Sequence, residues 1–133
     1  MEDMVANSLG WKIVSDRLVQ MFKSCANFKD IELIPLPDKA VQLDGRLGEY
    51  RVLGIKRHIE CVNYDHSDIL WTSSGEHILS FRECVLNSDS IPIDTDIFLI
   101  EEYPVFPVIS AELAIKMAEI RPTGFTFEKI RAV

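Results

Sequence analysis

Apolar and polar residues alternate most regularly in the stretch from Glu49 to Ser67. Its odd-numbered positions 53, 55, 59 and 61 are apolar, interrupted only by Arg57, whereas its even-numbered positions 56, 58 and 60 are polar. A period of two is typical of a β-strand that buries one face and exposes the other. We therefore predict one long strand here, or two strands bent at Gly54, and expect it to form the centre of a sheet.

The segment before this strand combines two extended runs with a helical pattern. A short strand is predicted over residues 11–14, and Ser15 is the expected N-cap of a helix from Asp16 to Cys25. A serine hydroxyl can accept a hydrogen bond from an unpaired backbone N–H group at the helix start. A second strand is predicted over residues 31–36. The helix has one apolar stripe, formed by Leu18, Met21, Phe22 and Cys25.

The end of the chain repeats this order. An extended run over residues 105–109 leads to a helix over residues 111–120, for which Ser110 is the expected N-cap. A Pro-Thr-Gly sequence separates this helix from a predicted strand over residues 125–130. Two similar strand-helix-strand arms are therefore predicted, although any capped amphipathic helix between strands gives this pattern. The second apolar stripe consists of Leu113, Met117 and Ile120, with Leu113 at the position equivalent to Leu18.

The remaining segments contain shorter signals. Residues 1–10 are expected to be a loose lead-in, and residues 38–47 a short excursion with a turn at an Asp-Gly pair. Apolar runs over residues 69–72 and 77–82 flank a Ser-Ser-Gly turn, and residues 97–100 are the most apolar predicted strand. These elements predict an α+β fold, in which two Ser-capped helices pack on a mostly antiparallel sheet of about five to seven strands.

The composition places these elements in one domain. The chain has 133 residues, 47% of them hydrophobic, which is sufficient for a single core over residues 1–133. No apolar run approaches the ~18 residues that cross a bilayer, and the start has no basic segment followed by an apolar one. Three widely spaced cysteines favour reduced thiols over a disulfide framework. We therefore expect a cytoplasmic protein.

The charged residues are distributed unevenly along the chain. Between His58 and Glu112 there are eleven acids and one base, Arg82, whereas the rest of the chain carries ten acids and thirteen bases. This distribution disfavours nucleic acid or an anionic membrane as a partner of the middle of the chain, and favours a basic protein surface. The alternative is that these acids only form a solvated face that keeps the protein soluble.

One stretch contains the residue types of a hydrolytic triad, Asp65, His66 and Ser67. In an extended backbone Asp65 and Ser67 point to one face and His66 to the other, so adjacent residues cannot pass a proton along. We therefore predict that Asp65 and Ser67 cap the turn after the long strand. Trp71, a few residues later, is expected to pack half-buried or, alternatively, to be exposed as an interface hot spot.

Other candidate chemistry is weak. His58 and Cys61 have the spacing of half a zinc site, but no second close pair of ligands follows, so we predict no metal. The glycines form no phosphate-binding motif, and no cofactor is expected. Arg51, Lys56 and Arg57 form a small basic cluster that we expect to pair with nearby acids rather than to bind an anion.

Six segments of the chain stand in a characteristic order: Trp11–Leu18, Tyr50–Leu53, Ile59–Ser67, Ile97–Glu101, Val108–Leu113 and Thr123–Phe127. Together and in this order they resemble a bacterial immunity-protein family, immunity protein family eleven, long catalogued as a domain of unknown function. The resemblance implies a protein that accompanies polymorphic toxins in competition between bacteria, and that binds and neutralises a cognate toxin by occlusion, without catalysis. Asn63 stands where the family pattern leads us to expect an acid.

Two hypotheses for function follow. In the first, the acidic residues after Glu83 contact a toxin with a basic surface, because toxins that cut nucleic acid need cationic surfaces to hold phosphate. The residues predicted to contact the toxin are Asp89, Asp94, Asp96, Glu101 and Glu102. In the second hypothesis, the chain is a small enzyme or ligand-binding domain with a pocket near His58, Cys61 and His66.

Overall fold

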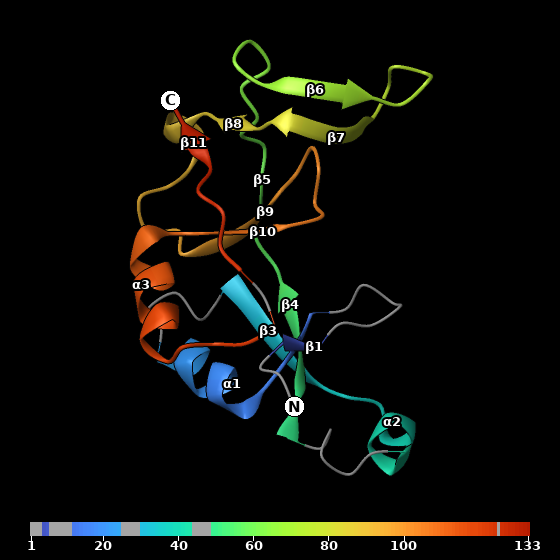
Figure 1. Ribbon diagram of the computed structural model, residues 1–133, viewed down its shortest axis with the longest axis vertical. Coiled ribbons are helices and arrows are strands. Elements are labelled where there is room, and N and C mark those ends of the chain that lie inside the picture. The colour runs from blue at the N-terminus through green and yellow to red at the C-terminus, as the bar shows by residue number, and fades with distance from the viewer. Residues whose placement is uncertain (1–3, 6–11, 25–29, 44–48, 125) are drawn as a thin grey trace.

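The computed structural model describes residues 4–5, 12–24, 30–43, 49–124 and 126–133 (Figure 1). Over these residues the chain forms α1 (Asp16–Lys23), α2 (Asp38–Leu43), α3 (Ala111–Glu119), the 3-10 helix η3 (Ser88–Ser90) and short strands arranged in four small sheets. Most strand pairs are antiparallel. The predicted α+β class is therefore confirmed, but the strands do not form one sheet.

The first sheet has the order β1-β2-β4-β3, and all of its neighbours are antiparallel. Its strands are β1 (Met4–Val5), β2 (Ile13–Val14), β3 (Ile31–Pro35) and β4 (Arg51–Ile55). β1 lies inside the segment that we expected to be a loose lead-in, so at least these two residues pair with the sheet. Trp11, predicted as the start of β2, lies outside the described residues.

The second sheet is built around β9 (Ile97–Ile100), which confirms the strand predicted from its apolar run. β10 (Pro107–Ile109) pairs with one edge of β9 in antiparallel orientation, and β5 (His58–Ile59) pairs with the other edge in parallel. Ile97, Phe98 and Ile100 are buried. A central position in the sheet explains why this strand is apolar on both faces.

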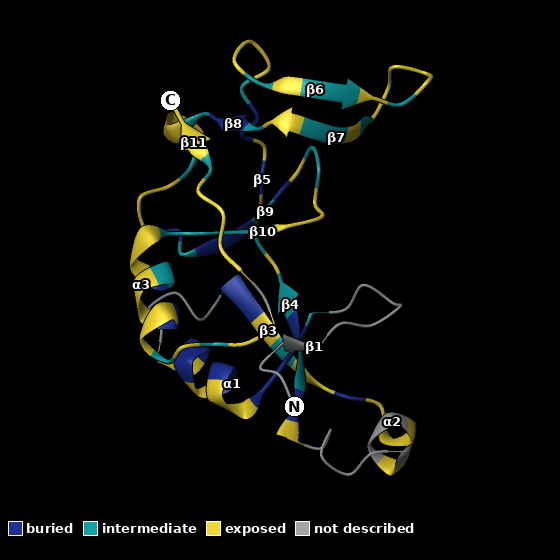
Figure 2. Ribbon diagram, in the orientation of Figure 1, coloured by how far each residue is buried: buried dark blue, intermediate teal, exposed yellow. Residues whose placement is uncertain are grey.

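The other two sheets are pairs of strands. β8 (Val85–Leu86) pairs in parallel with β11 (Arg131–Ala132), next to the C-terminus of the chain. β6 (Asp68–Trp71) and β7 (Ile78–Glu83) form an antiparallel hairpin around the predicted turn, where Gly75 has a φ of +72°. The hairpin projects at one end of the molecule and contains no buried residue (Figures 1 and 2).

The predicted long strand is interrupted at Lys56 and Arg57 rather than at Gly54. β4 ends at Ile55 in the first sheet and β5 begins at His58 in the second, so the stretch joins two sheets. Asp30 fixes the break: its carbonyl accepts a hydrogen bond from the Lys56 backbone N–H at 2.9 Å, and its carboxylate lies 3.2 Å from the Arg57 guanidinium. A Cβ at Gly54 would meet the nearest atoms of Glu32 at 3.5 Å, an ordinary contact.

The alternation of burial along this stretch is as predicted, despite the break. Leu53, Ile59 and Cys61 are buried. The side chains at positions 56, 58 and 60 are exposed. The expectation that the basic cluster pairs with nearby acids is confirmed for Arg57, whose partner is Asp30.

Both predicted helix caps are present. The Ser15 hydroxyl accepts a hydrogen bond from the Leu18 backbone N–H at 3.4 Å, and the Ser110 hydroxyl accepts one from the Leu113 backbone N–H at 3.1 Å. α1 ends at Lys23, and Cys25, the predicted end, lies outside the described residues. The two helices contribute to one core with residues of β2, β4 and β9; its members include Val14, Leu18, Phe22, Leu53, Ile97, Leu113 and Met117.

Two predictions along the chain were wrong. The second arm does not end in the predicted strand: the described residues 126–130 have no strand pairing, and pairing begins only at β11. Ile130 packs against a core, whereas residues 126–129 are exposed, so this segment lacks the buried face of a core strand. Residues 38–43, expected to be an excursion, form α2. The Asp-Gly turn predicted after it lies outside the described residues.

A second core lies between β5, β8 and β9. Its buried members are Ile59, Cys61, Val62, Leu86, Phe98 and Ile100, and Ile69 and Phe81 of the hairpin pack against it. The two cores follow one another along the long axis of the molecule (Figure 2). Among the described residues, no helix combines the length and the apolar character needed to cross a bilayer.

Candidate functional site

The five predicted acidic residues lie near the two ends of β9. Asp89 is in η3, and Asp94 and Asp96 precede the strand, whereas Glu101 and Glu102 follow it. A strand advances ~3.3 Å per residue, so Asp96 and Glu101 lie roughly 16 Å apart along the chain. The structure therefore divides the predicted surface into two groups that one partner would have to span.

Asp96 serves the fold. Its carboxylate accepts a hydrogen bond from the Ser110 hydroxyl at 3.0 Å, and its backbone carbonyl accepts one from the Ser110 backbone N–H at 2.8 Å. Because Ser110 is the N-cap of α3, Asp96 fastens the start of β9 to the start of this helix. A carboxylate here also faces the positive end of the helix dipole.

Glu102 also has a structural role. Its two carboxylate oxygens accept hydrogen bonds from the backbone N–H groups of Cys61, at 3.2 Å, and Val62, at 2.8 Å. These two residues follow β5 after one intervening residue, Glu60, where regular pairing with β9 has ended. Glu102 thus supplies the acceptors that a neighbouring strand no longer provides.

The other three acids present exposed side chains. Asp89 and Asp94 are exposed in the loop before β9. Glu101 is 57% exposed, and its carboxylate lies 3.1 Å from Nδ1 of His58, which is itself 42% exposed. Exposed carboxylates of this kind are accessible to a cationic partner, and the loop positions leave the backbone accessible as well.

The Asp65-His66-Ser67 sequence forms a turn. The side-chain oxygen of Asn63 accepts a hydrogen bond from the His66 backbone N–H at 2.9 Å and lies 3.1 Å from Nδ1 of the His66 ring. The Ser67 hydroxyl accepts a hydrogen bond from the Val85 backbone N–H at 2.9 Å and lies 3.1 Å from the Val85 carbonyl oxygen, which can accept its proton. Asn63 therefore caps this turn, a role we had assigned to Asp65, and Ser67 joins it to β8.

The residues of the alternative hypothesis do not meet in a reactive arrangement. Cys61 is 1% exposed, and burial, with smaller contributions from Glu102 and Cys84, raises the pKa of its thiol from 9.0 to about 12. A thiol with this pKa is protonated at neutral pH and is a poor nucleophile. Within the described part of the chain, no three His, Cys, Asp or Glu residues are grouped so that they could hold a metal ion.

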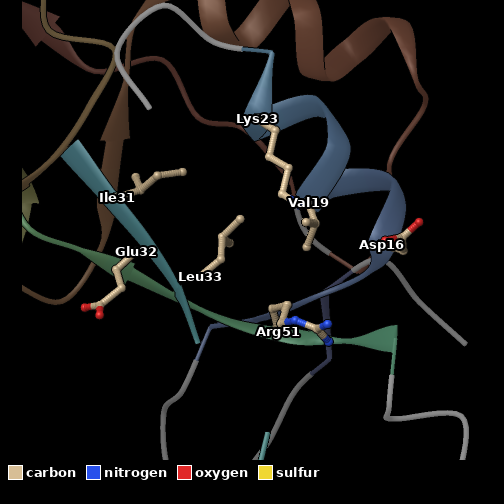
Figure 3. Close-up of a pocket in the computed structure, with 7 residues that line it drawn as sticks. All are labelled: Asp16, Val19, Lys23, Ile31, Glu32, Leu33 and Arg51. Atoms are coloured by element: carbon tan, nitrogen blue, oxygen red, sulfur yellow. The ribbon is translucent and has the colours of Figure 1, made fainter. Parts of the chain in front are cut away.

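A cavity of about 380 Å³ lies between α1, β3 and β4 (Figure 3). Its walls are apolar at Val19, Ile31 and Leu33, with charged side chains around them. The carboxylates of Asp16 and Glu32 lie on opposite sides and point away from one another (Figure 3). Ligand sites have a few polar groups that converge on one point, and this cavity lacks that convergence.

Two groups of aromatic side chains lie in the hairpin and in the segments that contact it. Trp71 of the hairpin is 45% exposed and stacks on Tyr64, with ring centroids 6.2 Å apart and an interplanar angle of 11°. Phe81 of the hairpin contacts Tyr103 edge to face at 5.4 Å, and Tyr103 contacts Phe106 at 6.2 Å. Phe106 is 64% exposed. We refer to these five residues as the aromatic surface.

The aromatic surface lies where the hairpin meets the loop between β9 and β10 (Figure 1). Glu101 and Glu102 belong to the same loop, so one of the two acidic groups adjoins it. Exposed Trp and Tyr side chains are enriched at interface hot spots because they bury a large area and lose little conformational entropy. Of these residues, sequence analysis had considered only Trp71, because the contacts join segments far apart in the chain.

Comparison with known proteins gives a family match. Among curated proteins, none matches the chain in sequence. The model of the immunity protein family Imm11 matches residues 1–132. This match covers nearly the whole chain, including the two Ser-capped helices, the interrupted central strand and the acidic region, and it agrees with the family resemblance predicted from the segments above. The chain belongs to the Imm11 immunity protein family.

Proposed function

We propose that this protein binds a cognate toxin and neutralises it by occlusion, without catalysis, in the cytoplasm of the cell that makes it. The observation that carries the proposal is the match of the immunity protein family over residues 1–132. The side-chain environments agree with a binding role. Cys61 is buried and protonated, and the polar groups of His66 and Ser67 hold a turn.

The charge distribution supports a toxin with a basic surface. Asp89, Asp94 and Glu101 are exposed, and there is no Lys or Arg between Glu83 and Glu112. Complementary charge accelerates association and orients the partners. An inhibitor that covers a phosphate-binding surface gains from this arrangement, because it occupies the same cationic groups as the nucleic acid.

The aromatic surface supplies the apolar part of the proposed interface. Trp71 of the hairpin and Phe106 of the loop that carries Glu101 are exposed apolar groups. Stable interfaces place a few aromatic anchors inside a polar rim, and the anchors provide most of the binding energy. In this proposal the exposed acidic residues attract the toxin, and the residues of the aromatic surface provide the apolar contacts.

Co-expression with the product of the gene next to this chain's gene, tested as the candidate toxin, tests the proposal. A binding protein that acts by occlusion co-purifies with the toxin domain and protects cells in proportion to its amount, reaching full inhibition at one molecule per toxin. An enzyme protects when it is far less abundant than the toxin, and leaves a modified toxin behind. A stably folded His66→Ala variant that no longer protects would also favour the enzyme hypothesis.

A further inference from the structure

A second cavity, of about 310 Å³, opens beneath the loop that contains Asp89 and Asp94. The loop contributes Ile91, Pro92 and Ile93 to its lining, β9 and β10 contribute residues that include Phe98 and Val108, and the C-terminal segment contributes Ile130 and Ala132. Most of this lining is aliphatic or aromatic. We call it the apolar groove.

Backbone contacts fix the walls of the apolar groove. The Val133 carbonyl oxygen accepts hydrogen bonds from the Ser88 backbone N–H at 2.8 Å and from the Ser88 hydroxyl at 2.7 Å. The Val133 backbone N–H donates to the Leu86 carbonyl at 2.9 Å, so the C-terminal segment is tied to the loop and to β8. The groove is formed in the free protein, and a ligand would not have to order its walls.

One polar group in the lining has no hydrogen-bond partner. Thr95 is 6% exposed, and its hydroxyl oxygen is buried without a donor or acceptor near it. Buried polar groups in native proteins nearly always have partners, and an exception needs an explanation. A hydrogen bond from this hydroxyl to a partner group that enters the groove explains the exception.

The mouth of the apolar groove exposes apolar surface as well. Ile93 is fully exposed, at 106% of its reference area, although it lines the groove. An apolar cavity of ~150 Å³ already admits a molecule as large as benzene. The apolar groove therefore has room for one large aliphatic or aromatic side chain, which would cover Ile93 when it enters.

The charges around the apolar groove select the partner. Asp89 and Asp94 lie in the loop that forms one wall, and Asp96 offsets the positive end of α3. Arg131, between the lining residues Ile130 and Ala132, forms an exposed ion pair with Glu83, 3.5 Å away. The rim is therefore acidic, and it attracts a segment that carries Lys or Arg beside its apolar side chain.

We propose that the apolar groove is a docking site for a basic segment of the toxin, which inserts one large apolar side chain between the loop and the C-terminal segment. The inference rests on the proposed function and adds a specific anchor to it. The apolar side chain displaces water from the groove and covers Ile93, flanking Lys or Arg side chains pair with Asp89 and Asp94, and a polar group of the segment bonds the Thr95 hydroxyl.

The test measures, by calorimetry, the affinity of variants of the full chain for the neighbouring gene's product that serves as the candidate toxin. Ala132→Leu adds carbon atoms inside the groove, whereas Ala118→Leu adds the same atoms on the exposed face of α3, away from it. We expect Ala132→Leu to weaken binding about tenfold or more without lowering the melting temperature, and Ala118→Leu to bind within about twofold of the wild type.

Thr95→Val provides a second, nearly isosteric variant. Because it removes an unpartnered buried hydroxyl, it should raise the melting temperature while it weakens toxin binding about threefold or more. If the unpartnered hydroxyl has no role in binding, Thr95→Val raises the melting temperature and leaves the toxin affinity unchanged. That result overturns the role assigned to the hydroxyl. Unchanged affinity of a folded Ala132→Leu protein overturns the docking site.

The remaining outcomes separate this inference from the proposed function. If the wild type binds the toxin and Ala132→Leu binds equally well, the proposed function stands and the docking site is wrong. If the wild type does not bind, both fail. If the wild type self-associates in sedimentation and Ala132→Leu abolishes the association, the occupant is a second copy of this chain and the inference of a toxin segment is overturned.

Discussion

The carboxylate of Glu102 accepts a hydrogen bond from the backbone N–H of Val62 at 2.8 Å, across 40 positions in the sequence. Its neighbour Glu101 instead points to an exposed histidine, His58. Two adjacent glutamates therefore have different roles: Glu102 holds the chain where β5 ends, and Glu101 is available to a partner. The proposed toxin contacts consequently reduce to the exposed acids Asp89, Asp94 and Glu101.

Substitution of the two glutamates should separate these roles. Glu102→Ala leaves two backbone N–H groups without their acceptor, and we expect it to lower the free energy of unfolding by ~1–3 kcal/mol. Glu101→Ala removes only an exposed contact with His58 and should change the free energy of unfolding by less than ~0.5 kcal/mol. Urea denaturation of both variants measures the difference. Equal effects would contradict the assignment of Glu102 to the fold.

Leu18 and Leu113 test whether the two capped helices share a core. They are 0% and 2% exposed and belong to the same buried cluster. Truncation of either to Ala should lower the free energy of unfolding by ~2–5 kcal/mol, because it removes buried carbon atoms and leaves a cavity. Chemical denaturation is the measurement, with Ile115→Ala on the exposed face of α3 as the control. Losses below ~0.5 kcal/mol at both sites would rule out the shared core.

Local sequence was sufficient where a structural contact spans only a few residues. Each N-cap bond joins positions three apart, Ser15 with Leu18 and Ser110 with Leu113, so the pattern that predicts the helix also predicts its cap. The alternation along β4 and β5 predicted burial for the same reason. The hairpin turn at Gly75 was likewise visible from neighbouring residues.

The features that sequence analysis missed depend on contacts between residues that are far apart in the chain. The break between β4 and β5 depends on Asp30, the residue before β3, which contacts Lys56 and Arg57. The difference between Glu101 and Glu102 depends on where β5 ends, and no local pattern distinguishes two consecutive glutamates. The aromatic surface arises because Phe81 of the hairpin meets Tyr103 of the loop between β9 and β10. The periodicity of apolar and polar residues along the sequence does not show which strands pair or which distant side chains meet.

Cys61 should be chemically inert in the folded protein. Its thiol is 1% exposed and its pKa is about 12, so almost no thiolate exists at pH 8. Iodoacetamide at pH 8 should therefore not label Cys61 until the protein is unfolded in urea, which mass spectrometry of peptides measures. Rapid labelling of native protein at Cys61 would contradict the buried position.

The same pKa has a consequence for alkaline stability. Below pH 9 the Cys61 thiol is protonated in both states, so it does not make stability depend on pH. Between pH 9 and about 12 the unfolded chain releases this proton and the folded chain keeps it, which favours unfolding by up to about 1.4 kcal/mol per pH unit. The free energy of unfolding should thus fall less steeply with pH in Cys61→Ala than in the wild type.

Charge reversal tests the acidic part of the proposed interface. Asp89→Lys together with Asp94→Lys should slow association with the toxin, whereas reversal of Asp96 would also disturb its contact with Ser110. Glu119→Lys at the end of α3 is the control, because it makes a charge reversal away from the loop. Association rates across a range of salt concentrations are the measurement, since exposed charges are screened over ~8 Å at physiological ionic strength. Rates that ignore salt and both reversals would show that the acids are only a solvated face.

Substitution of Trp71 tests the apolar part of the proposed interface. Trp71 is 45% exposed and stacks on Tyr64, which is 52% exposed, so neither ring is essential to a core. Trp71→Ala should therefore lower the free energy of unfolding by less than ~1 kcal/mol, since exposed substitutions have small effects. It should weaken toxin binding by ~2 kcal/mol or more, because a Trp buried at an interface is a typical hot spot.

The control for Trp71 is Phe127→Ala, which truncates an aromatic residue of almost equal exposure, 46%, in the C-terminal segment. Its effect on toxin affinity should be small, because Phe127 lies outside the aromatic surface. Calorimetry with the toxin domain gives the affinities, and urea denaturation gives the stabilities. If Trp71→Ala lowers the free energy of unfolding but leaves the toxin affinity unchanged, the stack with Tyr64 serves packing within the protein. The apolar anchor of the interface then lies elsewhere, and the apolar groove is the remaining candidate.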